Sequence, residues 1–336
     1  MKFSGALKIL FCLCTLALTP VRLLACASCG CTLSSDWGSL GFSTSYGFKV
    51  DFRYDYLNQD QLRSGTGSIS ASDASKISTD GDAQEVEKHT TNNYLTLGLE
   101  YNVRPSLGVN LQLPYIIRSH TTLGTASDGI TGGDGGGQYH SDTYNLGDIK
   151  VIGRYQGFFE TLRNFGVLLG AKLPTGRHAE TGASTDTTSP GPADIDRGLQ
   201  PGTGTTDLIL GVYFFDELSR NWNYFAQLIY QHALYMKDHY RPGHGTNLNL
   251  GLRYMGVSHF TPQVQLNARS VAHDVGANSD PVSTGGTLVY ISPGVVVPII
   301  QGLGIYGFTQ VPIFQNVRGV QLVPLYSASI GVRATF

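Results

Sequence analysis

Apolar residues recur at every second position in segment after segment of this chain. The clearest case covers residues 247–254, where three leucines and a tyrosine alternate with two asparagines, a glycine and an arginine. Side chains of a β-strand point to opposite faces in turn, whereas a helix repeats its apolar positions about every 3.6 residues. The alternation therefore predicts strands with one apolar and one polar face, and no helical period competes with it in these segments.

The C-terminal segment carries the same alternation and ends in an aromatic residue. Read backwards, one face would hold Phe336, Val332, Ile330 and Leu322, and Arg333 would lie on the other. This arrangement is typical of the last strand of bacterial outer-membrane barrels, in which a lipid face lies opposite a lumen face. A soluble sandwich would place bulkier side chains in its core.

Alternating runs continue along most of the chain. We predict about twelve strands, near residues 44–57, 91–103, 107–118, 146–157, 164–175, 205–215, 222–236, 245–257, 261–273, 286–299, 302–314 and 320–336. Short connections alternate with long polar ones at residues 58–90, 119–145, 177–204 and 274–285. This sidedness predicts an all-β chain, a transmembrane antiparallel up-and-down β-barrel over residues 41–336 with its long loops outside the cell.

Charged residues separate this prediction from a soluble two-sheet β protein, which also has many short strands. The polar faces of the predicted strands carry thirteen charged side chains: Asp51, Arg53, Asp55, Glu100, Arg118, Asp148, Lys150, Arg154, Lys172, Asp207, Arg253, Arg269 and Arg333. A soluble core could not bury them all. With 14% charged residues, 42 glycines and no long apolar run, the composition also fits a barrel.

The N-terminus predicts export. Lys2 and Lys8 precede or flank an apolar stretch too short to span a bilayer, so residues 1–25 read as a cleaved signal peptide. Residues 26–40 would follow as a periplasmic segment that contains Cys26, Cys29 and Cys31. These thiols allow one disulfide with an odd cysteine, a lipid on Cys26 with a Cys29–Cys31 bond, or a three-thiolate copper or zinc site. The alternatives stay open, and no cofactor is predicted.

We predict lumen or selectivity residues at nine positions: Arg53, Arg118, Asp148, Lys150, Arg154, Lys172, Arg253, Arg269 and Arg333. They either fill the lumen with hydrogen-bonded pairs or bias which solutes enter. Asp148 and Lys172 would pair if their two strands are neighbours. In the transport reading, loops 119–145 and 177–204 gate the lumen, and Arg53, Arg118, Lys150, Arg154 and Lys172 select.

Five short motifs occur in a recognisable order. They are GFKVDFRY at residues 47–54, LGD at 146–148, GRY at 153–155, GAKLPTG at 170–176 and GTGTTDL at 202–208. In this order they resemble the outer-membrane barrels grouped with the meta-pathway of phenol degradation, over most of the mature chain. The resemblance implies an exported barrel that passes small, often aromatic molecules.

Other functions have less support. A net charge of −2 without a basic cluster argues against nucleic-acid binding. The nine histidines are scattered, and none has a spacing that singles out a nucleophile or a metal site, so no enzyme is predicted. The predicted partners are the lipid of the cell outer membrane and a small-molecule solute. A periplasmic redox or metal protein bound through the cysteines, and loop-mediated surface contacts, remain alternatives.

Overall fold

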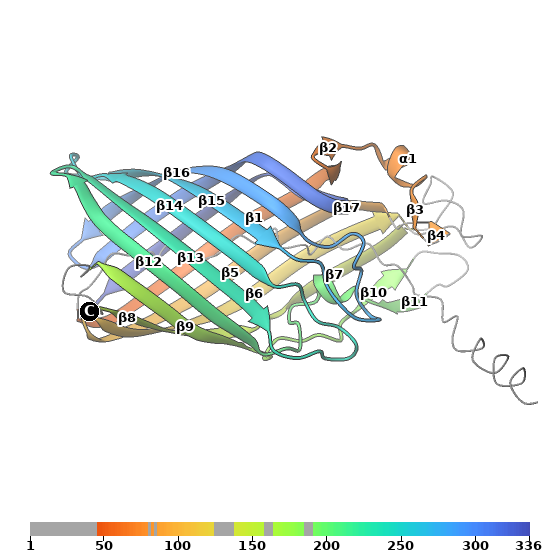
Figure 1. Cartoon of the computed structure of the whole chain (residues 1–336), viewed down its shortest axis with the longest axis horizontal. Coiled ribbons are helices and arrows are strands. Elements are labelled where there is room, and N and C mark those ends of the chain that lie inside the picture. The colour runs from red at the N-terminus through yellow and green to blue at the C-terminus, as the bar shows by residue number, and fades with distance from the viewer. Residues whose placement is uncertain (1–45, 80–81, 84–85, 124–137, 158–163, 185–190) are drawn as a thin grey trace, which may run out of the picture.

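The protein is a closed barrel of antiparallel strands (Figure 1). The computed structural model describes residues 46–79, 82–83, 86–123, 138–157, 164–184 and 191–336. The strands of the wall are β1 (Gly47–Gly65), β5 (Val86–Arg104), β6 (Leu107–Leu123), β8 (Ile149–Gln156), β9 (Phe165–Leu173), β12 (Asp207–Ser219), β13 (Trp222–Ala233), β14 (Gly245–Tyr254), β15 (Thr261–Val271), β16 (Gly286–Ile300) and β17 (Leu303–Thr335).

Within the described residues these eleven strands form an unbroken ring, each pairing with its neighbours in chain order. The ring closes where β1 pairs with the end of β17, from Lys49 opposite Thr335 onward. Strand β7 (Gln138–Leu146) continues β8 upward along β6, after a break at Gly147 and Asp148. Closure removes every free edge from this wall, so its backbone donors and acceptors are paired.

Strand β17 accounts for the difference between eleven strands and the predicted twelve. Its first half pairs with β16 and its second half pairs with β1. The Thr335 amide donates to the Gly302 carbonyl at 2.7 Å, so the two ends of β17 lie side by side. Gly319, with φ of +62°, lies between the halves. The chain doubles back there and crosses the wall twice, which makes twelve crossings.

The two faces of the wall differ as the alternation predicts. In β14, Asn247 and Asn249 are buried inside while Leu248 and Leu250 are exposed outside. The same holds on the last strand, where Ile330 and other apolar side chains are exposed and the serines between them are buried. The barrel therefore has an apolar outer surface and a polar interior.

The predicted face of Leu322 is wrong, because this side chain is 1% exposed. The pairing of β1 with β17 shifts in register on both sides of Gln59, and these shifts interrupt the alternation of β17 close to Leu322. Next to it, Val320 packs with Ala74 of the short helix α1 (Ala71–Ala74) and with Val86. Both faces of the wall are covered here, so five successive residues from Val320 to Pro324 are buried.

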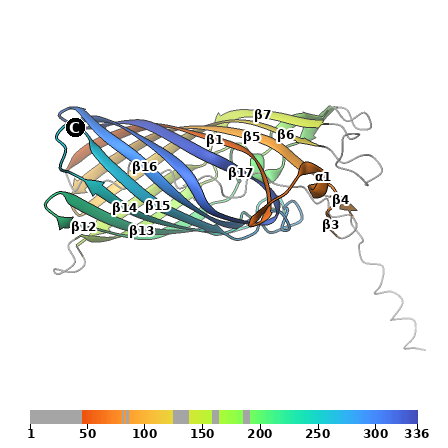
Figure 2. The same cartoon turned by 90° about the horizontal axis from the view of Figure 1, so that it is seen from above.

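The two ends of the barrel are unlike (Figures 1 and 2). Short turns such as Pro105–Ser106 gather at the end where β1 begins and β17 finishes, and the long connections gather at the other. Several strands run further into the long connections than predicted: β1 reaches Gly65, β5 starts at Val86, and β6 and β7 occupy much of 119–145. Polar residues there give no apolar alternation, but ladder bonds keep them extended.

Several short elements lie at the long-loop end. They are β2 (Gly67–Ser68), which pairs with β1, β3 (Ser78–Thr79) with β4 (Asp82–Ala83), β10 (Thr181–Ser184) with β11 (Gly191–Asp194), and the 3₁₀ turn η1 (Arg197–Leu199). Strand β10 also adds to β7. None of the described helices is long and apolar enough to cross a membrane.

Candidate functional site in the barrel lumen

The last part of the connection between β9 and β12, residues 195–203, turns into the barrel. Its 3₁₀ turn ends at Leu199, which is 1% exposed, and Ile195 beside it is also buried. Arg118 on β6 donates through Nη1 to the Leu199 carbonyl, and through Nε and Nη2 to Asn92 and Tyr94. The segment 195–203, here called the inward segment, is thus tied to the wall at β5 and β6.

Three glycines meet where the connection between β9 and β12 leaves the wall and returns to it. A Cβ on Gly202 would lie 2.5 Å from the carbonyl carbon of Gly176, and one on Gly176 would lie 2.9 Å from that of Gly147. Side chains do not fit at such distances, so only glycine allows this close backbone approach. The two ends of the connection therefore leave the wall at one point.

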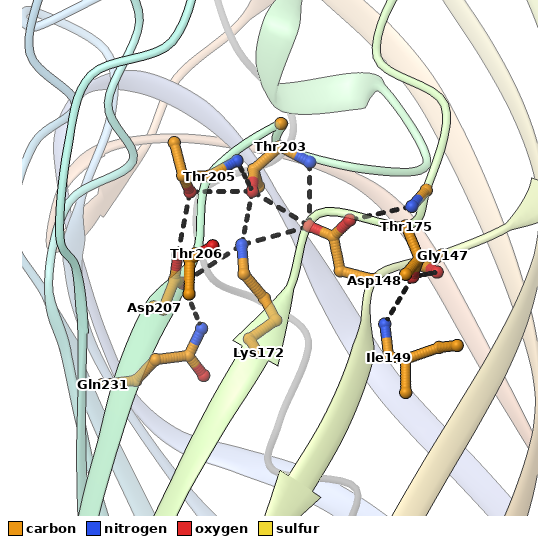
Figure 3. Close-up of polar contacts among 12 residues, drawn as sticks. Gly147, Asp148, Ile149, Lys172, Thr175, Thr203, Thr205, Thr206, Asp207 and Gln231 are labelled. Carbon is orange, nitrogen blue, oxygen red and sulfur yellow. Dashed lines mark hydrogen bonds and ion pairs between the residues drawn. The ribbon is translucent and has the colours of Figure 1, made fainter.

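A buried ionic cluster lies at the same point (Figure 3). The Lys172 ammonium on β9 is 3.1 Å from an Asp148 oxygen and 3.1 Å from an Asp207 oxygen, and it donates to the Thr203 hydroxyl. All three charged side chains are at most 6% exposed. The predicted pairing of Asp148 with Lys172 is confirmed, and Asp207 of the next strand completes it.

Neutral donors complete the coordination of both carboxylates. Asp148 accepts from the backbone amides of Gly176 at 3.0 Å and Thr203 at 2.9 Å, and Asp207 accepts from Thr205 and Gln231. Buried carboxylates are stable only with such partners. The cluster therefore fixes both ends of the connection to the wall, and its two negative charges exceed its one positive charge.

Below the inward segment lies a lumenal cavity of about 320 Å³. Its wall includes an apolar patch of Ile152, Ile209 and Ile229, which pack together with Leu168. Gly170 lies between Ile152 and Ile209 in the ladder, and a Cβ there would be 2.9 Å from Ile152 Cγ1. The missing side chain lets the isoleucines meet, so the cavity has one apolar wall among polar ones.

The nine predicted charged residues fall into two groups. Five of them line the cavity: Arg118, Asp148, Lys150, Lys172 and Arg269. The other four bind partners elsewhere along the wall: Arg53 to Asp55 at 2.8 Å, Arg154 to Asn102 at 2.7 Å, Arg253 to Gln263 at 3.0 Å and Arg333 to Asp51 at 3.1 Å. The structure places them in the interior; whether they select solutes stays a prediction.

Sequence reasoning missed several cavity residues. Ile152, Ile209 and Ile229 occupy lumenal positions of their strands, and an apolar side chain at such a position was a readable signal. Arg197 and Asp274 come from connections without periodicity, where sequence offers no comparable signal. Cys26, Cys29 and Cys31 lie outside the described residues. Among the residues that are described, no group of three or more His, Cys, Asp or Glu side chains is arranged to hold a metal.

Comparison with known proteins places the fold. No protein-family model and no curated protein matches the chain. An outer-membrane channel from Pseudomonas putida F1 has a TM-score of 0.60 to this chain at 11% identity, over 87% of this chain and 96% of that one. The chain therefore shares the β-barrel fold of that channel.

Two further solved structures have weaker likenesses. The β domain of the Bordetella autotransporter BrkA gives a TM-score of 0.48 at 13% identity, over 86% of this chain and all of that one. The Ralstonia pickettii toluene transporter TbuX gives 0.44 at 11% identity, over 87% and 90%. Identity at this level concerns the fold alone, so the resemblance to the meta-pathway barrels stays a prediction.

Proposed function

We propose that this chain is an outer-membrane channel that passes small, largely apolar solutes without catalysis. The observation that carries the proposal is the lumenal cavity of about 320 Å³, which joins the isoleucine patch to polar groups inside a closed wall. Sites for small ligands are usually concave, mostly apolar and provided with a few polar groups. The likeness of the fold to the Pseudomonas putida channel supports the same proposal.

The outer surface of the barrel supports a membrane location. Apolar side chains such as Leu169, Leu210 and Ile330 are more than 40% exposed, although burying each of them would stabilise a soluble protein by about 2 kcal/mol. A lipid phase supplies that burial. Export through a signal at residues 1–25, with residues 26–40 left in the periplasm, belongs to the same proposal.

Passage in this proposal is diffusion through a narrowed lumen. A solute with one ring and one hydroxyl would place its ring on Ile152, Ile209 and Ile229 and its hydroxyl among the polar side chains around them. The inward segment narrows the route above the cavity. Because Arg118 and Lys172 secure that segment or its ends, they set the width of the route as well as its charge.

The charges of the site refine the selectivity prediction. Lys172 is offset by two carboxylates, so we expect it to add little attraction for anions. Arg118 bonds only to neutral groups among the described residues. We therefore expect Arg118, more than Lys172 or Arg154, to favour anions over cations, as reversal potentials in a salt gradient would measure.

The proposal is tested by current blockade in a planar bilayer, with phenol as the solute. The refolded protein should give steady ionic current, which phenol interrupts at a frequency that rises with its concentration. Ile209→Ser should shorten the interruptions because it removes apolar contact, while Ile209→Val should leave them nearly unchanged. Current without any phenol-dependent interruption, or equal interruptions in both variants, would remove the proposed solute class.

A further inference from the structure

Three connections meet over the cavity at the long-loop end. They are the inward segment, the hairpin of residues 234–244 between β13 and β14, and residues 272–285 between β15 and β16. The hairpin turns tightly at Asp238 and His239, which both have positive φ, and Lys237 pairs with Tyr240 across the turn. Tyr240 is 3% exposed and lies at the centre of this arrangement.

Arg197 joins the inward segment to the hairpin. Its guanidinium donates to the carbonyls of His178 at 2.8 Å and Thr203 at 3.0 Å. Its Cζ also lies 5.2 Å from the centre of the Tyr240 ring, within the range of a cation–π contact. Tyr240 is therefore held from one side by a permanent positive charge.

Asp274 joins the hairpin to the third connection. The Tyr240 hydroxyl donates to one Asp274 oxygen at 2.9 Å, and the Gly243 amide donates to the other at 2.8 Å. The Asp274 amide in turn donates to the Thr284 hydroxyl at 2.9 Å. At 7% exposed, Asp274 is a buried carboxyl whose two oxygens both hold the hairpin in place.

The groups around Asp274 make its ionised form costly. Burial raises the pKa of Asp274 to about 6; the bonds from Gly243 and Tyr240 lower it, and Asp280 in the same connection raises it further. The neighbouring His273 ring is bonded to Arg318 of β17 at 3.2 Å, and Arg241 meets this connection through backbone bonds to Val275. No ion pair with Asp274 occurs among the described residues.

We propose that Asp274 makes the hairpin 234–244 a proton-sensitive latch over the lumen, closed when the carboxyl is protonated and loosened when it ionises. The neutral acid keeps both contacts, since one oxygen accepts from Gly243 while the acid hydroxyl donates to the Tyr240 oxygen. The carboxylate gains hydration by swinging into water, and this separates the hairpin from residues 272–285. The latch regulates the proposed channel and therefore rests on the proposed function.

The direction follows from linkage. An acid whose pKa is higher in the latched state than its ordinary 3.8 binds protons more tightly in that state, so lower pH favours the latched form. The advantage is complete below the ordinary value and is lost as pH rises through about 6. Across this window the latching equilibrium changes by at most about 160-fold, because the pKa differs by about 2.2 between the two states.

Two measurements on the refolded full chain test the latch: hydrogen exchange of residues 238–243, corrected for intrinsic rates, and open fraction in a planar bilayer, both between pH 5 and 7.5. We expect protection to rise and open fraction to fall below about pH 6. Asp274→Asn, which stays neutral, should behave at every pH as the native protein does at pH 5. Asp280→Asn should move the midpoint to lower pH, and Asp216→Asn at the short-turn end should change nothing.

The outcomes separate the latch from the channel. Exchange that depends on pH in the native protein but not in Asp274→Asn supports the latch, even if the bilayer is silent, and silence would overturn the proposed channel instead. Exchange without pH dependence, or the same dependence in Asp274→Asn, overturns the latch whatever the bilayer shows. A higher open fraction at pH 5 than at pH 7.5 would contradict the proposed direction.

Discussion

At the level of single residues, the Lys172 ammonium is a buried positive charge between two buried negative charges. It touches oxygens of Asp148 and Asp207, each at 3.1 Å. Removing one partner of a buried ionic group leaves the others without compensation, which costs more than the pair itself contributes. The cluster should therefore be sensitive to loss of the cation and tolerant of joint replacement.

Lys172→Met tests this sensitivity. We expect a loss of about 3–5 kcal/mol in the free energy of unfolding, measured in detergent or vesicles by denaturant titration. The triple variant Lys172→Met, Asp148→Asn, Asp207→Asn should recover much of the loss, because no unpaired charge remains. Lys237→Met, which removes a half-exposed lysine, is the control and should cost under about 1 kcal/mol. Equal effects at both lysines would contradict the account.

Part of this cluster was predictable from the sequence. Asp148 directly precedes β8 and Lys172 lies on β9, and both face the lumen, so their pairing followed from alternation and chain order. Thr203 has no such signal, because it reaches Lys172 only after the connection has turned inward and returned. Alternation predicts which residues are neighbours within the wall, but it gives no information on which loop residues contact them.

At the scale of elements, the inward segment is held by a few long-range bonds. The longer stretch that contains it, residues 177–204, is rich in Gly, Pro, Ser and Thr and has no period, so we predicted that stretch only as a gating loop. What places it inside is the Arg118 bond to Leu199 and the contact between Gly176 and Gly202. Strands, in contrast, were predictable because each repeats one local pattern.

Arg118→Ala should free the tip of the inward segment. The Leu199 carbonyl loses its donor, and Asn92 and Tyr94 lose their shared partner, while the ladder bonds of β6 remain. We expect single-channel conductance to rise severalfold with longer fluctuations, measured in a planar bilayer. Arg253→Ala, which removes a lumenal arginine that does not line the cavity, is the matched control. Unchanged conductance in Arg118→Ala would show that this bond does not position the segment.

On the scale of the whole molecule, the barrel joins an apolar outer surface to a polar interior. The alternation predicted both faces and about twelve crossings, with the two passes of β17 expected as strands near 302–314 and 320–336. The buried face of Leu322 depends on shifts in pairing that sequence does not reveal. In the proposed location, lipid covers this apolar outer surface.

Leu250→Lys tests whether lipid surrounds the outer surface at the middle of β14, where the side chain is exposed on the outer face. In a barrel that spans a bilayer, a lysine near the midplane should reduce the free energy of folding into phospholipid vesicles by about 2–4 kcal/mol. Leu218→Lys, near the short-turn end, should cost about 0–1 kcal/mol. A soluble barrel would show no such difference and would gain solubility from both changes.

The most direct test of the central claim is the conductance of the refolded protein with and without residues 177–201. Gly176 and Gly202 already touch, so a two-glycine linker can replace these residues without displacing the wall. We expect a small, steady conductance for the native chain and a much larger one for the shortened chain. Equal conductances would mean that the inward segment does not narrow the route, and silence from both would mean that the barrel is not a channel.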